Sequence, residues 1–316
     1  MNRDVELAAA FVGARPRLTR IAYGVLGSQA DAEDVVSDCW LRLVNADASD
    51  PVLDVEAWAT VTVARRALDA LRSARRRRET YIGPWLPEPL VEPLAFGDFP
   101  SGDPADQVTL DESVGYALLV VLETLSPAER VAWVLHDVFR LPFPEVAEIV
   151  GRTPAAVRQL ASRARAHVAS GPGRRDVDPV EHSAAVTAFA RATTTGDLGG
   201  LLAVLDPGVV LTSDGGGHVT AARRPVRGAD RVARFLLGVA GKGHPDQRTD
   251  PITVNGLSGL AILSGTQLVA VASFTVFDRL IRRVDLILAP DKLPSGHPPA
   301  SAPSAGRYGD LGRHPR

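Results

Sequence analysis

Apolar residues recur every three to four positions along two long stretches of the N-terminal part of the chain. Between residues 4 and 45 this spacing predicts two or three helices, with Gly27 ending one helix and Ser28 capping the next. Residues 55–78 predict another helix, whose polar side becomes richer in arginine towards its C-terminal end. This part of the chain therefore predicts an all-helical domain.

A second helical pattern occupies residues 111–168. Ser126 and Glu129 have the spacing of a capping box, so a helix begins there. Residues 144–168 contain a short helix, a glycine at 151 suited to a left-handed turn, and a longer helix with a small apolar inner side. This arrangement predicts a helix-turn-helix, and the arginines on its outer side favour the major groove of DNA. A pair of packed helices with a solvated basic side is the alternative.

The pattern changes after about residue 178. Helical spacing at 184–192, 198–205 and 230–239 alternates with short runs rich in β-branched residues. The predicted strands are 209–212, 219–222, 252–254, 260–263, 268–276 and 280–288. The glycines after Asp214 indicate a tight turn between two strands, and Asn255-Gly256 is typical of a hairpin. These elements predict an α+β domain with a curved antiparallel sheet.

Proline and glycine mark the boundaries between these parts. Six prolines between residues 79 and 110 exclude a long helix or a central strand, which indicates a linker. Tyr81 and Trp85 are its expected anchors on a neighbouring surface. The predicted organisation is a helical domain, a linker, a second helical domain, an α+β domain and a disordered tail, at 1–78, 79–110, 111–171, 178–293 and 294–316.

Charge and cysteine content narrow the function classes. The 316 residues carry a formal net charge of −2, but the arginines are clustered, and the run at 75–78 indicates contact with phosphates. The single cysteine, Cys39, excludes a disulfide within the chain and a zinc site built on several cysteines. No signal peptide or bilayer-spanning apolar run is evident, so a soluble cytoplasmic protein with no membrane partner is expected.

Three motifs together resemble the extracytoplasmic-function (ECF) sigma factors of bacterial RNA polymerase. DAEDVVSDCWLRLV at 31–44 is similar to the segment that binds the coiled coil of the polymerase β′ subunit. AWATVTVARRALDALRSARRRR at 57–78 is similar to the segment that melts and binds the −10 promoter element. Residues 125–168 are similar to region 4, whose recognition helix binds the −35 element. The resemblance implies core RNA polymerase, through its β′ coiled coil and β flap, and promoter DNA as partners.

The resemblance also implies roles for individual residues. The implied polymerase-binding residues are Asp31, Glu33, Asp34, Asp38 and Arg42, although charge alone favours a solvated helix face there. The implied DNA-binding residues are Arg65, Arg66, Arg72, Arg75, Arg76, Arg152, Thr153, Arg158, Gln159, Ser162, Arg163 and Arg165. Many members of the family carry asparagine where Arg66 stands, so no single base is assigned to that position.

The linker and the last domain resemble the sigma-factor subgroup that carries a fused C-terminal SnoaL-like domain. The similarity rests on SARRRRETYIGPWLPEPL at 73–90, DGGG at 214–217 and APDKL at 289–293, where the subgroup usually has asparagine in place of Ala289. It implies a cone-shaped α+β domain that docks on the sigma domains and modulates their activity. The residues implied in this docking are Tyr81, Trp85, Asp214, Gly215, Gly216, Asp291 and Lys292.

Two other functions stay open from sequence alone. SnoaL-like folds also form enzymes, and Asp214, His218 and Asp285 are titratable residues near strands, but they form no convincing acid–base pair. No catalytic residue, cofactor or metal site is therefore assigned, while a small-molecule ligand that shifts domain docking is an alternative. A DNA-binding regulator that never contacts polymerase is the third hypothesis, and it would leave residues 31–78 without a use.

Overall fold

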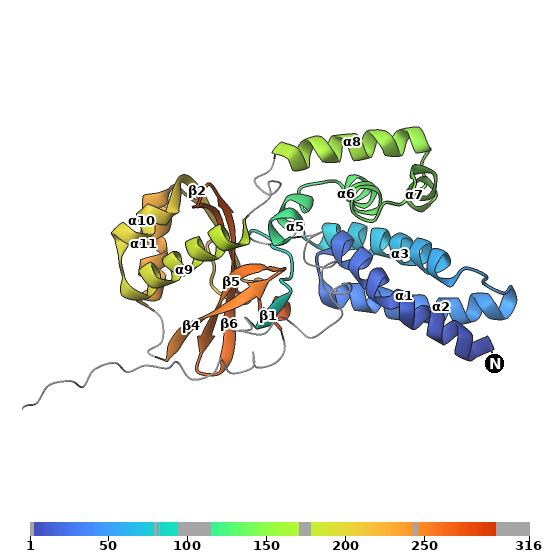
Figure 1. Ribbon diagram of the computed structural model, residues 1–316, viewed down its shortest axis with the longest axis horizontal. Helices are drawn as coiled ribbons and strands as arrows, with labels where there is room; N and C mark the ends of the chain where they lie inside the picture. Colours follow the sequence, from blue (N-terminus) through green and yellow to red (C-terminus); the bar gives the residue numbers. More distant parts are fainter. Residues whose placement is uncertain are drawn as a thin grey trace, which may run out of the picture.

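The computed structural model describes residues 3–78, 81, 83–93, 115–170, 178–242 and 246–294. In Figure 1 the helices of the N-terminal half form one side of the molecule and the α+β domain forms the other. The predicted helical residues 111–114, the boundary at 171–173 and the tail beyond 294 lie outside the described residues. Among the helices in those ranges, none is both long and apolar enough to cross a membrane.

The first helical group consists of α1 (Arg3–Leu26), α2 (Gln29–Ser49) and α3 (Val55–Arg78). Gly27 ends α1 with a φ of +69°, and Ser28 caps α2 by accepting a hydrogen bond from the Asp31 N–H, as predicted. Cys39 is buried in the core of this group, and burial raises the pKa of its thiol to about 12. It is therefore an inert packing residue.

The second helical group consists of α5 (Tyr116–Leu122), α6 (Pro127–Trp133), the π-helix η1 (Val134–Val138), α7 (Phe143–Val150) and α8 (Pro154–Ser170). Ser126 and Glu129 form the predicted capping box. Gly151 ends α7 in the left-handed conformation, and the Thr153 hydroxyl accepts a hydrogen bond from the Ala156 N–H in the first turn of α8. Helices α7 and α8 are the predicted helix-turn-helix.

The two helical groups share one continuous hydrophobic core. Its buried residues come from α1, α2 and α3 and also from the helices of the second group. Val134 packs against α1 so closely that a Cβ added to Gly24 would lie 3.2 Å from Val134 Cγ1. Arg130 crosses the same contact, where its Nε donates a hydrogen bond to the Gly24 carbonyl oxygen at 3.3 Å. The two groups are therefore tightly packed against each other.

The C-terminal domain is built on a mixed sheet of seven strands, counted over the described ranges, in the order β1-β4-β5-β6-β7-β2-β3. The strands are β1 (Val91–Pro93), β2 (Leu205–Asp214), β3 (Val226–Arg227), β4 (Gln247–Val254), β5 (Leu257–Ser264), β6 (Gln267–Phe277) and β7 (Leu280–Ile287). All neighbours run antiparallel except β2 and β7, which are parallel. Asn255 and Gly256 form the predicted hairpin turn, with positive φ at both residues.

The prediction of a strand at 219–222 was wrong. These residues form part of a loop, and β2 pairs instead with the two-residue strand β3. Val219 and Thr220 are exposed in that loop and pair with no described strand. Their β-branched side chains favour a strand only where cross-strand neighbours pack against them. The glycines after Asp214 therefore open a longer loop and do not form a tight turn between two strands.

Different parts of the chain cover the two faces of the sheet (Figure 1). One face is covered by α9 (Pro179–Thr195), α10 (Leu198–Val204) and α11 (Ala229–Ala240). The opposite face, here called the docking face, buries Leu86 of the linker and Tyr116 of α5. The linker also adds β1 to the edge of β4, a position where its prolines do not interrupt a central strand.

Candidate functional sites

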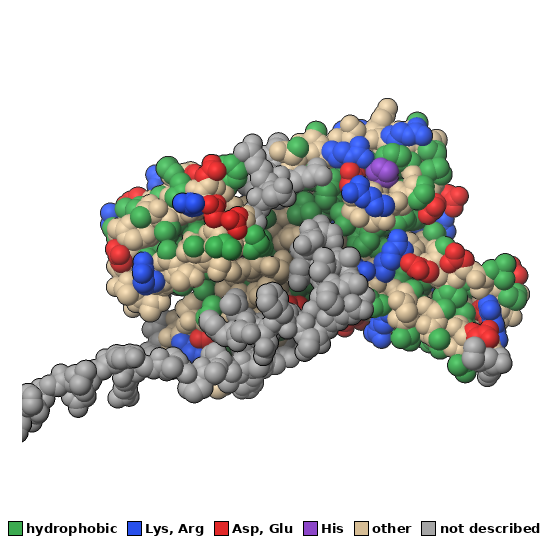
Figure 2. All heavy atoms as spheres, viewed as in Figure 1, with side chains coloured by type: hydrophobic (Ala, Val, Ile, Leu, Met, Phe, Trp, Pro, Cys, Tyr) green, Lys and Arg blue, Asp and Glu red, His purple; other side chains and the backbone are tan. Residues whose placement is uncertain are grey.

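Helix α8 presents a polar and basic side to solvent. Val157, Leu160 and Ala164 are buried against neighbouring helices, which directs the opposite side outward. The predicted DNA-binding residues here are exposed, apart from the half-buried Arg165: Arg152, Thr153, Arg158, Gln159, Ser162 and Arg163. Figure 2 shows several basic side chains over α8, at the top right of the view. This surface has the shape and charge that a major groove accepts.

Two of these arginines have partners within the chain. Arg163 pairs with Glu129 at 2.8 Å, and Arg165 pairs with Asp137 at 2.6 Å. The hydrogen bond from Arg163 is the main reason that the pKa of Glu129 lies below its ordinary value. The Arg163 side chain is 60% exposed, and an exposed pair of this kind contributes at most about 1 kcal/mol. A DNA phosphate can therefore replace such a partner at small cost.

The acidic side of α2 carries the predicted polymerase-binding residues. Asp31, Glu33, Asp34 and Arg42 are exposed and Asp38 is half-buried. Asp38 pairs with Arg42 at 2.9 Å and with Arg66 of α3 at 3.0 Å, and these bonds hold the pKa of Asp38 below its ordinary value. The predicted polymerase-binding and DNA-binding residues therefore meet at Asp38. Arg72, also on α3, is exposed beside Asp69.

Two of the three remaining predicted arginines of α3 are turned towards the second helical group. Arg65 Nη2 donates to the Glu148 carbonyl oxygen of α7 at 3.3 Å. Arg75 Nη1 donates to the Leu125 carbonyl oxygen, just before α6, at 3.0 Å. The side chain of Arg76 lies outside the described residues. In this arrangement Arg65 and Arg75 bridge the two helical groups, a role that the sequence did not predict.

The carboxylate of Asp214 is the centre of a contact between the linker and the C-terminal domain. Asp214 is fully buried at the end of β2, and Lys292 Nζ lies 2.6 Å from its Oδ2. The linker supplies two donors, because the Tyr81 hydroxyl donates to Oδ1 and the Leu86 N–H donates to Oδ2 at 2.8 Å. Tyr81, Trp85, Asp214 and Lys292 are called the linker clamp below.

Lys292 ends the 3₁₀ helix η2 (Pro290–Lys292) and completes the clamp from the other side. Its buried Nζ donates to the Leu86 carbonyl oxygen at 2.7 Å and lies 3.0 Å from the centre of the Trp85 ring. Burial opposes ionisation of Asp214, but the charge and hydrogen bond of Lys292, together with the hydrogen bonds from Tyr81 and Leu86, more than offset it, and the pKa of Asp214 lies below its ordinary value. The ion pair is therefore charged at neutral pH.

The predicted glycines shape the loop that carries this carboxylate. A Cβ added to Gly215 would lie 2.1 Å from a backbone carbonyl oxygen of the loop. Gly216 has a φ of +67°, and a Cβ there would lie 2.9 Å from the Ala289 Cβ. Its N–H donates to Asp214 Oδ1 at 3.0 Å, which is the turn expected of an aspartate before glycine. Asp291 is exposed beside Gly216.

A second polar contact, which the sequence analysis missed, fixes the far end of the linker. Asn255 Oδ1 accepts a hydrogen bond from the Leu90 N–H at 3.1 Å, and Asn255 Nδ2 donates to the Tyr23 hydroxyl of α1 at 3.0 Å. The Tyr23 hydroxyl in turn donates to the Glu88 carbonyl oxygen at 2.8 Å. These bonds connect α1, the linker and the β4–β5 turn. The hairpin signal accounted for the backbone of Asn255, so nothing in the sequence pointed to its side chain.

The titratable residues considered for an enzyme do not lie in one pocket. Asp285 is buried on the docking face and pairs with Arg283 at 2.7 Å, and burial raises its pKa. Asp214 belongs to the linker clamp, and His218 is exposed. His182 is buried on the other face, where its Nε2 lies 3.2 Å from a backbone carbonyl oxygen of β6. The three sequence candidates therefore do not form an acid–base pair.

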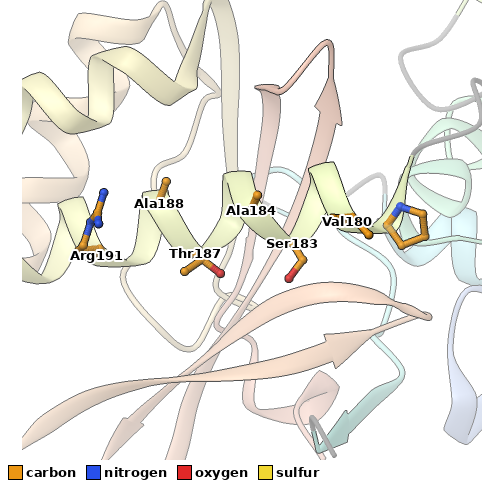
Figure 3. A pocket seen from close by; sticks show the side chains of 7 residues that line it. Val180, Ser183, Ala184, Thr187, Ala188 and Arg191 are labelled. Atoms are coloured by element: carbon orange, nitrogen blue, oxygen red, sulfur yellow. The ribbon is translucent and has the colours of Figure 1, made fainter. Parts of the chain in front are cut away.

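A shallow groove follows the exposed side of α9 (Figure 3). Small side chains line most of it, including Ser183, Ala184, Thr187 and Ala188, and Arg191 closes one end. Arg191 is the one charged group among its described lining residues. The groove therefore offers little chemistry with which to select a ligand.

Comparisons with known proteins agree with the helical architecture. The family model for Sigma-70 region 2 matches residues 11–77, and the model for Sigma-70, region 4 matches residues 116–168. The first match covers α3 and the acidic side of α2, and the second covers the helix-turn-helix. Two such modules, joined by a linker and followed by an α+β domain, define a sigma-type transcription initiation factor.

Similar proteins narrow this class to one family. The ECF RNA polymerase sigma factor SigJ of Mycobacterium tuberculosis (strain ATCC 25618 / H37Rv) is 44% identical over 257 residues, covering 81% of this chain and 78% of SigJ. The probable ECF RNA polymerase sigma factor SigI of Mycobacterium tuberculosis (strain CDC 1551 / Oshkosh) is 38% identical over 242 residues, covering 75% of this chain and 78% of SigI.

A solved structure extends the similarity to the C-terminal domain. The crystal structure of the Mycobacterium tuberculosis extracytoplasmic function sigma factor SigJ matches with a TM-score of 0.71 and 37% identity, covering 90% of this chain and 97% of that one. The chain belongs to the ECF RNA polymerase sigma factors. It directs bacterial RNA polymerase to specific promoters.

Proposed function

We propose that the acidic side of α2 binds the coiled coil of the β′ subunit of core polymerase and that the second helical group docks on the β flap. Asp31, Glu33 and Asp34 are exposed with no ion pair to any described residue, so they can meet a basic partner without breaking an internal ion pair. The protein performs this function in the cytoplasm, where RNA polymerase acts.

On promoter DNA, α3 contacts the −10 element and α8 contacts the −35 element. Arg158, Gln159, Ser162 and Arg163 supply base contacts from the exposed side of α8, where a good bidentate pair discriminates bases by about 1–3 kcal/mol. Arg152, Thr153 and Arg165 lie at the edges of that side, and they position the helix on the backbone together with the arginines of α3.

The C-terminal domain regulates this activity by holding the two helical groups together through the linker. The carrying observation is that α3 and α7 lie within hydrogen-bonding distance, since Arg65 Nη2 is 3.3 Å from the Glu148 carbonyl oxygen. The −10 and −35 elements are centred about 25 base pairs apart, or about 85 Å along B-DNA. Both helical groups cannot occupy their elements while they are packed in this way.

The linker clamp is the device that favours the closed arrangement. Asp214 and Lys292 bind the linker at Leu86, and Asn255 binds it at Leu90. Gly215, Gly216 and Asp291 shape the loop and the short helix that present these two charges. The domain division at 1–78, 79–110, 111–171 and 178–293 is part of this proposal, and the two sigma-region matches on either side of the linker support it.

The proposal is tested by opening the clamp with Asp214→Asn. Two exposed residues, Ser37 on α2 and Ala166 on α8, are replaced by cysteine and labelled with a dye pair, because the native Cys39 is buried and inert. Asp214→Asn removes the charge that Lys292 and the linker share. We expect energy transfer between the dyes to fall and, in the unlabelled variant with no added cysteine, the affinity for core polymerase to rise by about tenfold or more.

Asp206→Asn is the matched control, because Asp206 lies on the same strand but pairs with Arg282 near the surface. It should leave both readouts unchanged. Combining Asp214→Asn with Arg158→Ala and Arg163→Ala should keep polymerase binding and lose promoter binding. A lower polymerase affinity in Asp214→Asn, or the same behaviour in both aspartate variants, would contradict a closing role for the C-terminal domain.

A further inference from the structure

A cavity of about 490 Å³ lies where the three domains meet. Its walls come from α3, from residues 84–86 of the linker, from α5 and α6 with their connection, and from the docking face of the sheet. The cavity therefore exists only while the domains are packed together. It is separate from the groove on α9 and from the sheet face that α9, α10 and α11 cover.

Positive charge dominates the lining of this cavity. Four arginines reach it from four different elements, namely Arg75 of α3, Arg130 of α6, Arg227 of β3 and Arg283 of β7. Glu123 is the one acidic residue among the described lining residues. An excess of arginine in a partly enclosed space favours an anion, because the low local dielectric strengthens the attraction.

Two of the four charges have no carboxylate partner among the described residues. Arg130 and Arg283 each form an ion pair with an acidic residue. Within the described ranges the Arg75 side chain bonds only a backbone carbonyl, and the Arg227 side chain forms no hydrogen bond or ion pair. In addition, the Arg130 side chain is only 1% exposed, and its Nη2 has no hydrogen-bond partner in the part of the chain that is described. Arg130 therefore has hydrogen-bonding capacity that its described neighbours do not use, beside a cavity that it lines.

We propose that this junction binds a small organic anion. Its carboxylate or phosphate group would accept hydrogen bonds from Arg75, Arg130 and Arg227, since arginine forms charge-assisted pairs with either group. The remaining walls are largely apolar and include Leu71 and Val120, so an aromatic or aliphatic body fits beside the charged group. The volume lies within the range of about 300–1,000 Å³ that is usual for small-molecule sites.

Such a ligand would act on all three domains at once. It binds only the packed arrangement, so it shifts the population towards that arrangement. This consequence rests on the proposed closing role of the C-terminal domain, whereas the binding site itself does not. Binding and closure are therefore measured separately.

The site is tested by calorimetric titration of the full chain at constant pH and ionic strength. The probes are phenyl phosphate and benzoate, which combine an anionic group with a ring, inorganic phosphate, which is the charged group alone, and phenol, which is the neutral ring. We expect saturable one-to-one binding of phenyl phosphate, benzoate or both, weaker binding of inorganic phosphate, and no binding of phenol. The better of the two ring compounds identifies the charged group that the site prefers.

Arg227→Gln should weaken the best probe by about tenfold, because it removes a charged donor from an exposed residue whose side chain forms no hydrogen bond or ion pair with a described residue. Arg231→Gln is the matched control, since Arg231 is an exposed arginine of α11, which covers the opposite face of the sheet. Absence of saturable binding, or equal weakening by both variants, would overturn the site. If the probe binds but the dye pair at residues 37 and 166 does not shift towards closure, the site stands and the proposed closing role fails.

Discussion

Two contacts hold the molecule in its closed arrangement, and they differ in kind. The contact between the helical groups is mostly apolar: a continuous core passes through it, and Val134 fits against Gly24. The contact between the linker and the C-terminal domain is polar and buried, with Asp214 and Lys292 exposed by 0% and 5%. The first contact depends on shape, and the second depends on a few bonds.

This difference affects how each contact responds to change. Apolar packing loses stability gradually, in proportion to the cavity that a smaller side chain leaves, and neighbouring side chains reduce this cost by partly filling the cavity. A buried ion pair fails abruptly, since removing one partner leaves an uncompensated charge in a low dielectric. The linker clamp is therefore suited to switching between arrangements, whereas the contact between the helical groups gives the closed arrangement a steady stabilisation.

The largest expected effect comes from Lys292→Met. It leaves the buried Asp214 carboxylate without its counter-charge, which costs about 3–5 kcal/mol. The amide of Leu86, which donates to Asp214 Oδ2, then exchanges with solvent about 100-fold faster or more, as native-state hydrogen exchange would record.

A double-mutant cycle sharpens this result. Adding Asp214→Asn to Lys292→Met removes the stranded charge and should recover part of the lost protection at Leu86. Arg282→Gln, which breaks the exposed pair with Asp206, is the control and should leave the Leu86 amide unchanged. Additive losses in the double variant would mean that Asp214 and Lys292 are not energetically coupled.

A smaller and more gradual effect is expected from Val134→Ala at the contact between the helical groups. The fully buried side chain loses two methyl groups beside Gly24, which lowers the free energy of unfolding by about 1–3 kcal/mol. Denaturant unfolding measures this loss. Val12→Ala, at an exposed position of α1, is the control, and an equal effect of both variants would contradict tight packing at Val134.

Sequence alone predicted the elements whose cause is local. The capping box at Ser126, the left-handed Gly151 and the apolar side of α8 are set by residues within a few positions of one another, and each is present. The fold class followed from the same local patterns. The exception was the strand at 219–222, because a strand also needs a neighbour and β-branched residues cannot supply one.

The candidate sites were predictable only in part, for a related reason. Asp214 and Lys292 were named from their resemblance to a subgroup, but the bonds that join them to Leu86 connect segments far apart in the chain. Nothing local distinguishes Arg75, which bridges to the second helical group, from Arg72, which stays at the surface. The cavity has the same origin, because its lining is assembled from several elements by tertiary packing.

The smallest expected effect is a dependence of stability on pH, which should arise in the C-terminal domain and in neither of the two contacts. The pKa of Asp214 lies below its ordinary 3.8, so the Asp214 carboxylate of the linker clamp stays ionised between pH 8 and 5, and the contact between the helical groups is formed mainly by apolar core residues. His182 is buried, and burial lowers its pKa below the ordinary 6.5. Below about pH 6.5 His182 binds a proton in the unfolded chain but not in the folded domain. The free energy of unfolding therefore falls as the pH is lowered, by at most about 1.4 kcal/mol per pH unit. Denaturant unfolding from pH 8 to 5 should show this slope, and His182→Gln should flatten it. The Leu86 amide should keep its protection from hydrogen exchange over the same pH range. An unchanged slope in the variant would mean that His182 does not cause it.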